Sequence, residues 1–215
     1  MHYTSVLFDL DGTLLDTLGD LTAAMNRTLT RHGLPERTRQ QMRAALGNGA
    51  RRLMELSVPD GTDGALFETL LAEYNADYAA HCRIETAPYP GVDALLRQLH
   101  AQGRKLAIVS NKPDEAVRAL RAEFFAGTIS IAVGEKTGIR RKPAPDTLLA
   151  AMAQLGADPA STVYVGDSEV DIATARAAGL PCISVLWGFR DRDMLEQAGA
   201  QQFAADADEL ARLLD

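Results

Sequence analysis

The sequence has few cysteines, no long apolar run and fewer basic than acidic residues. Only Cys82 and Cys182 occur, so a disulfide framework is not expected, and both are interpreted as small hydrophobic residues. No apolar stretch approaches the roughly 20 residues that span a bilayer. The first residues show neither a basic start nor a small-residue cleavage site, which argues against a signal peptide. We therefore expect a soluble, cytoplasmic protein without membrane contact.

The charge balance argues against a nucleic-acid partner. The chain of 215 residues has 22 Lys and Arg against 29 Asp and Glu, for a net charge of −7, and its longest basic run is Arg140-Arg141-Lys142. Nucleic-acid binders normally present a basic face. With 47% apolar and 24% charged residues, the chain has the composition of one globular domain, or of one domain with a smaller insert. We expect a monomer or a homodimer.

Short apolar, β-branched runs alternate with helical patterns over most of the chain. The expected strands cover residues 5–8, 105–109, 129–133, 162–165 and 182–186. The expected helices between them cover residues 92–101, 113–122, 145–155 and 171–178. This alternation predicts an α/β fold, with a doubly wound, mainly parallel, Rossmann-like sheet. Such sheets bind ligands beyond the carboxyl ends of their strands.

One long segment, residues 16–82, interrupts the alternation with helical patterns alone. Thr17 to Asp20 has the form of a capping box and opens an apolar-periodic run that stops near Gly33. Further helices are expected at residues 37–46, 50–57 and 65–80. An insert this long is not an ordinary crossover between strands. We therefore expect a core domain of residues 1–15 and 83–215, with residues 16–82 as an inserted helical cap domain.

Two carboxylates follow the first expected strand in the run Asp9-Leu10-Asp11-Gly12-Thr13. Residues two apart in a strand project to the same side, so both acids can face one site. Like charges this close need a cation between them, or one acid must keep its proton. Both conditions suit phosphoryl transfer, in which a cation shields the acid that acts as nucleophile and the other, protonated acid is the proton donor. The alternative is a solvated Asp-Gly turn.

Two later strand ends carry groups that suit a phosphate. Ser110 and Asn111 follow the expected strand 105–109, where a hydroxyl and backbone N–H groups can bind a phosphate oxygen, although an ordinary helix cap has the same residues. Lys142 lies in a segment stiffened by Pro143 and Pro145. A lysine held there can neutralise a phosphate, whereas the alternative is a solvated surface charge.

Asp167 and Asp171 come at the end of the strand 162–165 and the start of the next helix. Their spacing lets both carboxylates reach one ion, and hard oxygen ligands without a His or Cys cluster favour Mg²⁺. Ser168 and Asp171 also have the form of a capping box, which is the alternative interpretation. A parallel sheet would bring all these strand ends to one edge, and this joint pattern favours the site.

The four motifs resemble those of the haloacid-dehalogenase-like hydrolases over essentially the whole chain, beginning with Asp9-Leu10-Asp11-Gly12-Thr13. The resemblance implies that Asp9 attacks phosphorus and forms an aspartyl-phosphate, while Asp11 protonates the leaving alcohol and then deprotonates water. It also implies that Ser110 and Lys142 hold phosphoryl oxygens, with Gly12 and Asn111 beside them in the same motifs. The implied Mg²⁺ ligands are the Asp9 side chain, the Asp11 carbonyl, Asp167, and Asp171 directly or through water.

Within this family the chain is most similar to the phosphoglycolate phosphatases, as in Tyr89-Pro90-Gly91-Val92 and Trp187-Gly188-Phe189-Arg190. The resemblance implies a small phosphorylated metabolite as substrate. Asn48, in Gly47-Asn48-Gly49, is the cap residue expected to bond a substrate carboxylate, unless this run is only a helix-breaking turn.

Four other activities remain open at this point. Related pyrophosphatases and sugar-phosphate phosphatases share much of the pattern. Sugar phosphomutases of the same fold keep the phosphoenzyme but transfer the phosphoryl group back to a sugar. Dehalogenases of this fold lack the acid equivalent to Asp11. A phosphoaspartate signalling domain is the alternative that is not an enzyme, but such domains are shorter and have no helical cap.

Overall fold

The computed structural model describes residues 3–215, which divide into two compact units. The core unit comprises the chain up to Leu15 together with Pro88–Asp215, and the helical unit comprises Asp16–Ala87. The return to the core unit thus lies at Pro88, five residues after the expected boundary at residue 83. Two short strands, β2 (Leu15–Asp16) and β3 (Ala87–Pro88), pair where the chain leaves and re-enters the core unit. Among residues 3–215, no helix has the length and apolar content to cross a membrane.

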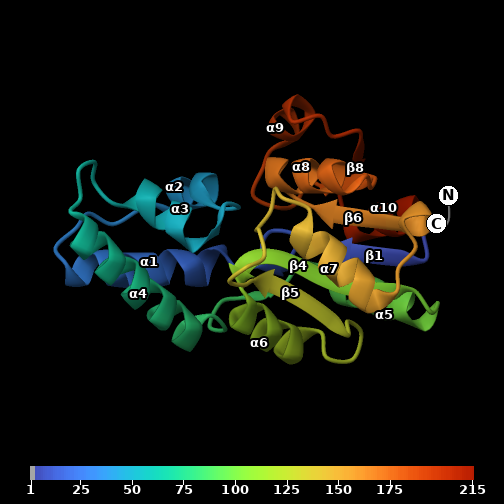
Figure 1. Ribbon diagram of the computed structural model, residues 1–215, viewed down its shortest axis with the longest axis horizontal. Helices are drawn as coiled ribbons and strands as arrows, with labels where there is room; N and C mark the ends of the chain where they lie inside the picture. Colours follow the sequence, from blue (N-terminus) through green and yellow to red (C-terminus); the bar gives the residue numbers. More distant parts are fainter. Residues whose placement is uncertain (1–2) are drawn as a thin grey trace. The chain divides into compact units, whose positions relative to one another are not determined.

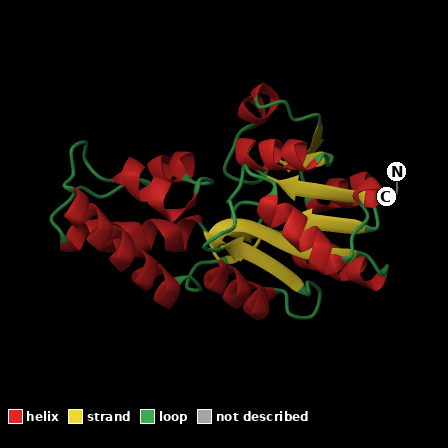
Figure 2. Cartoon of the chain, in the orientation of Figure 1, coloured by secondary structure: helices red, strands yellow, loops and turns green. Residues whose placement is uncertain are grey.

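A parallel sheet forms the centre of the core unit (Figures 1 and 2). Within the described chain it has six strands, in the order β5 (Ile131–Glu135), β4 (Lys105–Pro113), β1 (Ser5–Phe8), β6 (Thr162–Gly166), β7 (Cys182–Val185) and β8 (Gln202–Ala204). Every neighbouring pair is parallel. The chain adds β4 and β5 on one side of β1 and then crosses to β6 on the other side. The doubly wound α/β prediction is confirmed.

The central strand β1 is buried at all four residues. Leu7 packs in a cluster with Leu148, Ala151 and Met152 of α7 (Asp146–Leu155). Because side chains alternate along a strand, Val6 and Phe8 face the other side of the sheet, and both are completely buried. Burial on both faces is what a parallel sheet covered by helices on each side requires.

The remaining core helices are α5 (Val92–Ala101), α6 (Asp114–Phe124), α8 (Glu169–Ala178), α9 (Arg192–Gln197) and α10 (Ala207–Leu214), with a 3₁₀ turn at Pro159–Ser161. The helices α5 to α8 match the expected ones closely. The sequence did not predict α9, α10 or β8. The strand expected at residues 129–133 is β5, and it begins at Ile131. Ile129 lies before it in a turn, where its N–H donates to the Phe125 carbonyl at 3.0 Å.

The helical unit contains α1 (Leu18–Arg31), α2 (Arg39–Ala45), α3 (Gly49–Ser57) and α4 (Gly64–His81). The capping box predicted at Thr17 is wrong, because the Thr17 side chain makes no capping hydrogen bond. The Asp20 carboxylate instead accepts from the backbone N–H groups of Ile84, Glu85 and Thr86, at 2.9–3.1 Å, and from the Thr86 hydroxyl at 2.8 Å. Asp20 therefore ties the end of the helical unit to the first turn of α1.

Candidate functional site

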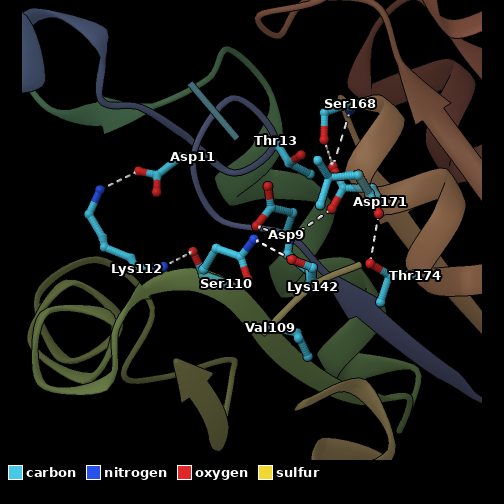
Figure 3. Close-up of polar contacts among 12 residues, drawn as sticks. Asp9, Asp11, Thr13, Val109, Ser110, Lys112, Lys142, Ser168, Asp171 and Thr174 are labelled. Carbon is cyan, nitrogen blue, oxygen red and sulfur yellow. Dashed lines mark hydrogen bonds and ion pairs between the residues drawn. The ribbon is translucent and has the colours of Figure 1, made fainter. Parts of the chain in front are cut away.

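The polar residues of the candidate site lie at the carboxyl ends of the strands, where the strand order reverses. Asp9 directly follows β1, and Asp167 follows β6, the strand paired with β1 on one side. Ser110 lies within β4, which pairs with β1 on the other side. This position is where an open α/β sheet binds its ligands. Figure 3 shows Ser110, Lys142 and Asp171 near Asp9.

A tight turn presents the two acids after β1. The N–H groups of Leu14 and Leu15 both donate to the Leu10 carbonyl at 3.0 Å. Gly12 has a φ of +84°, in the left-handed region that favours glycine. A Cβ atom at Gly12 would lie 2.3 Å from Asp167 Oδ2, so the position also requires glycine for space. Gly12 thus allows the turn to approach the end of β6.

A buried lysine joins two of the acids. Lys142 Nζ lies 2.8 Å from Asp9 Oδ1 and 2.7 Å from Asp171 Oδ1, and only 3% of its side chain is exposed. It also donates to the Tyr164 hydroxyl at 3.0 Å. Asn111 donates from Nδ2 to the Lys142 carbonyl at 3.0 Å, which holds the backbone of this segment. Lys142 is therefore a fixed counter-charge of the acids and not a solvated surface residue.

Asp171 is surrounded by donors. Lys142 Nζ and the Tyr164 hydroxyl reach Oδ1, while the N–H and Oγ of Ser168 donate to Oδ2 at 3.1 and 2.6 Å. The capping box of Ser168 and Asp171 is present, and it uses the same carboxylate that binds Lys142. A carboxylate has about four acceptor positions, so Asp171 is close to saturated by these neighbours.

Asp167 is held by the segment after β7. The Phe189 N–H donates to Asp167 Oδ2 at 2.7 Å, and the Thr13 hydroxyl donates to Oδ1 at 3.3 Å. A Cβ atom at Gly188 would lie 2.3 Å from Asp167 Cβ and 2.4 Å from the Gly12 carbonyl oxygen. Gly188 is a positioning residue that sequence reasoning missed, since glycine in a loop does not show what approaches it.

The three buried acids lie close enough to repel one another. Asp9, Asp167 and Asp171 each place a carboxylate oxygen within 4.8 Å of the others. Burial raises the pKa of Asp9 well above its usual range, with Asp171 and Asp167 adding repulsion and Lys142 opposing it. Burial and the charge of Asp171 raise the pKa of Asp167 to about 7. Burial alone would lower the pKa of Lys142, but Asp171 and Asp9 raise it well above its usual value.

This arrangement fits a divalent cation. One lysine cannot neutralise three carboxylates, and burial together with the remaining repulsion raises the pKa values of Asp9 and Asp167. A cation among hard oxygen ligands would relieve it, and Mg²⁺ and similar ions prefer such ligands. The cluster is thus consistent with a bound divalent metal.

Asp11 lies apart from this cluster in Figure 3, turned toward Lys112. Lys112 Nζ donates to Asp11 Oδ1 at 2.6 Å. The Lys112 N–H lies 3.3 Å from Ser110 Oγ and donates to it. Lys112 was not among the predicted site residues, because nothing in the sequence showed that its side chain would reach Asp11.

The expected substrate residue of the helical unit, Asn48, stays a prediction. It is the N-cap residue of α3, and its side chain makes no capping hydrogen bond. Tyr164 and Thr13 are further buried residues that contact the acids, and neither is among the residues predicted for the site. A tyrosine inside a buried strand is indistinguishable from a core residue in the sequence.

The fold and the acid cluster define a hydrolase of the family predicted from the motifs. Residues 6–185 match the family model of the haloacid dehalogenase-like hydrolases, and the chain belongs to this family. The chain is 36% identical over 187 residues to phosphoglycolate phosphatase of Xanthomonas campestris pv. campestris, covering 86% of this chain and 84% of the relative.

Two further relatives extend over the whole chain. N-acetylmuramic acid 6-phosphate phosphatase of Pseudomonas aeruginosa is 32% identical over 217 residues, covering 100% of this chain and 96% of the relative. A solved structure of a candidate phosphoglycolate phosphatase from Lactobacillus delbrueckii subsp. bulgaricus has a TM-score of 0.94 and 36% identity, covering 100% of this chain and 99% of that one. The relatives from Xanthomonas and Pseudomonas are both named as phosphatases, with different substrates.

Proposed function

We propose that the chain is a Mg²⁺-dependent phosphatase that hydrolyses a small phosphomonoester, with 2-phosphoglycolate as the first candidate. The observation that carries the proposal is the buried group of Asp9, Asp167 and Asp171 around Lys142. The identity to phosphoglycolate phosphatases supports this candidate. The relative that acts on N-acetylmuramic acid 6-phosphate makes a sugar phosphate the second candidate.

In the first step, a carboxylate oxygen of Asp9 attacks phosphorus, and the bond from phosphorus to the leaving oxygen breaks. Asp11 gives a proton to the leaving oxygen, so the products are an alcohol and an aspartyl-phosphate on Asp9. In the second step, Asp11 takes a proton from water, whose oxygen attacks phosphorus. The bond from phosphorus to the Asp9 oxygen breaks, which releases phosphate and restores the carboxylate.

The buried lysine would balance charge during both steps. Lys142, at 2.8 Å from Asp9 Oδ1, is placed to neutralise phosphoryl oxygens next to the nucleophile. Ser110 and Asn111 belong to the same strand end, and we assign Ser110 Oγ and the turn at Gly12 to phosphoryl binding.

Bound Mg²⁺ would be held by Asp9, Asp167 and the Asp11 carbonyl, and would neutralise the carboxylates and the phosphoryl group. The near-saturation of Asp171 favours an indirect role for it.

A phosphate-release screen tests the proposal. Purified protein should release phosphate from members of a panel of metabolite phosphates, including 2-phosphoglycolate and N-acetylmuramic acid 6-phosphate, with Mg²⁺ and not with excess EDTA. Release from no member of the panel would overturn the proposed activity. Isomerisation of a hexose phosphate without net phosphate release would identify a phosphomutase instead.

A further inference from the structure

Each of the two predicted catalytic acids has its own lysine. Lys142 Nζ lies 2.8 Å from Asp9, and Lys112 Nζ lies 2.6 Å from Asp11. Figure 3 shows that the Asp11 side chain points to Lys112 and away from Asp9. In the proposed reaction, however, Asp11 must reach the oxygen that leaves the phosphorus attacked by Asp9. The Asp11 side chain therefore has to turn away from Lys112 when a substrate is bound.

This turn removes a partner from a lysine that water barely reaches. The Lys112 side chain is 6% exposed and the Asp11 side chain is 20% exposed. Breaking a contact between two groups this poorly exposed is unfavourable, because little water is available to replace it. A substrate that offers Lys112 another anion would compensate for the lost contact. A substrate with a neutral leaving group would not.

We propose that Lys112 binds an anionic group on the leaving portion of the substrate, and that this contact frees Asp11 to act. The proposal rests on the proposed phosphatase function and narrows its substrate class. The substrate then carries a carboxylate or a second phosphate close to the phosphate ester. 2-Phosphoglycolate has such a carboxylate. Lys142 then serves the transferred phosphoryl group, and Lys112 serves the leaving group.

Two substrates of similar size test this division. In 2-hydroxyethyl phosphate a neutral hydroxymethyl group replaces the carboxylate of 2-phosphoglycolate. We expect Lys112→Met to lower kcat/KM for 2-phosphoglycolate about 10- to 100-fold more than for 2-hydroxyethyl phosphate, since hydrogen bonds to charged groups are worth this much. Ethylene glycol bisphosphate, with a second phosphate, distinguishes a carboxylate site from a general anion site. Both outcomes for this third substrate support an anionic subsite and differ only in its range.

The matched control is Lys105→Met, which removes the same charge from the opposite end of β4. Lys105 Nζ donates to the Gly156 carbonyl, away from the acids. This variant should leave the ratio of the two kcat/KM values unchanged. Lys112→Arg retains the charge and should keep most of the preference, even if Lys112→Met is poorly folded.

Three results separate the possible failures. Equal kcat/KM values for 2-phosphoglycolate and 2-hydroxyethyl phosphate in the unmodified protein would overturn the role of Lys112 while the phosphatase activity stands. The role of Lys112 would also be overturned if Lys112→Met lowered kcat/KM equally for both substrates. The preference for 2-phosphoglycolate would then be the same in both Lys112 variants as in the unmodified protein. Absence of any phosphate release by the unmodified protein would instead overturn the proposed function itself.

Discussion

Lys142 and Asp171 form an ion pair of 2.7 Å in which both side chains are almost completely buried. The same Asp171 carboxylate accepts from the N–H of Ser168 at the start of α8. The start of α8 therefore fixes the Asp171 carboxylate, which in turn fixes the ammonium group of Lys142 at 2.8 Å from Asp9. We infer from these contacts that Asp171 positions Lys142 beside Asp9.

Replacing Asp171 should affect stability and activity together. In Asp171→Asn an amide would face Lys142 and Ser168, so a buried ammonium loses one of its two counter-charges. We expect the free energy of unfolding to fall by about 3–5 kcal/mol, the usual cost of breaking a buried pair. Ser168→Ala, which removes one hydrogen bond to the same oxygen, should cost only about 1–2 kcal/mol. Urea unfolding measures both, and equal stability of Asp171→Asn and the parent would contradict the role.

The two acids after β1 should have separable roles. Asp9→Asn removes the nucleophile, so no phosphoenzyme should form and activity should fall by at least about 10⁴-fold. Asp11→Asn leaves the nucleophile intact but removes the base that activates water, so the phosphoenzyme should accumulate. Mass spectrometry of acid-quenched protein measures the phosphorylated fraction. Asp158→Asn, at an exposed cap of the 3₁₀ turn, is the charge-matched control and should behave as the parent. Parent-like activity of either Asp9→Asn or Asp11→Asn would contradict the mechanism.

Metal binding should depend on pH in a defined direction. The pKa of Asp167 is raised to about 7 by burial and by Asp171, and that of Asp9 is also raised by burial. The metal-free folded state therefore binds more protons than the unfolded state between about pH 4 and 7, and its stability should fall as pH rises through this window. A divalent cation replaces these protons, so it should stabilise the protein more at higher pH.

Thermal unfolding at two pH values measures this coupling. Mg²⁺ should raise Tm by several degrees at pH 8 and by much less at pH 5, where protons compete for the same carboxylates. NaCl at matched ionic strength controls for screening. Asp167→Asn should lose most of the Mg²⁺ effect at pH 8. A Tm increment that is the same at both pH values would argue against these acids as ligands.

The sequence predicted which strands place Asp9 and Asp167 at one edge of the sheet, because this depends on local patterns. Asp9 and Asp167 follow strands whose apolar, β-branched residues are easily recognised, and a parallel sheet necessarily gathers such strand ends. The strand β8 (Gln202–Ala204) was missed because three residues without a β-branched side chain give no periodic signal. Asn48 remains a prediction because its role depends on how substrate meets the helical unit.

Contacts between residues distant in the chain were beyond the sequence. Asp20 has the local spacing of a capping box, yet its carboxylate binds backbone groups at residues 84–86. Asp11 accepts a hydrogen bond from Lys112, which is 101 residues away. Such pairs are set by how helices and strands pack, and a single sequence carries no direct record of that packing.

Asp20 should stabilise the helical unit. Three backbone N–H groups and one hydroxyl donate to its carboxylate, which is 3% exposed as a residue. Asp20→Asn leaves one acceptor oxygen for these donors, so the free energy of unfolding should fall by about 2–4 kcal/mol. Asp63→Ala, which removes an exposed cap of α4, should cost only about 1 kcal/mol. An Asp20→Asn protein as stable as the parent would show that the hydrogen bonds from residues 84–86 do not require the negative charge of Asp20.

Gly188 offers a purely steric test of the site, because its φ does not lie in the left-handed region. A methyl group there would lie 2.3 Å from Asp167 Cβ and 2.4 Å from the Gly12 carbonyl oxygen, so the end of β6 and the turn after β1 must move apart. Displacing catalytic groups by about 1 Å can cost about 100-fold in rate, and Gly188→Ala should lose activity on this scale.

Gly127 is the matched control for this substitution. It also has no positive φ, and a Cβ atom there would meet nothing within 4 Å. Gly127→Ala should therefore retain the activity and the Mg²⁺ response of the parent. In Gly188→Ala the Mg²⁺-induced rise in Tm should shrink along with kcat/KM, since the methyl group displaces Asp167. Lost activity with an unchanged Mg²⁺ response would mean that the loop acts on the substrate and not on Asp167.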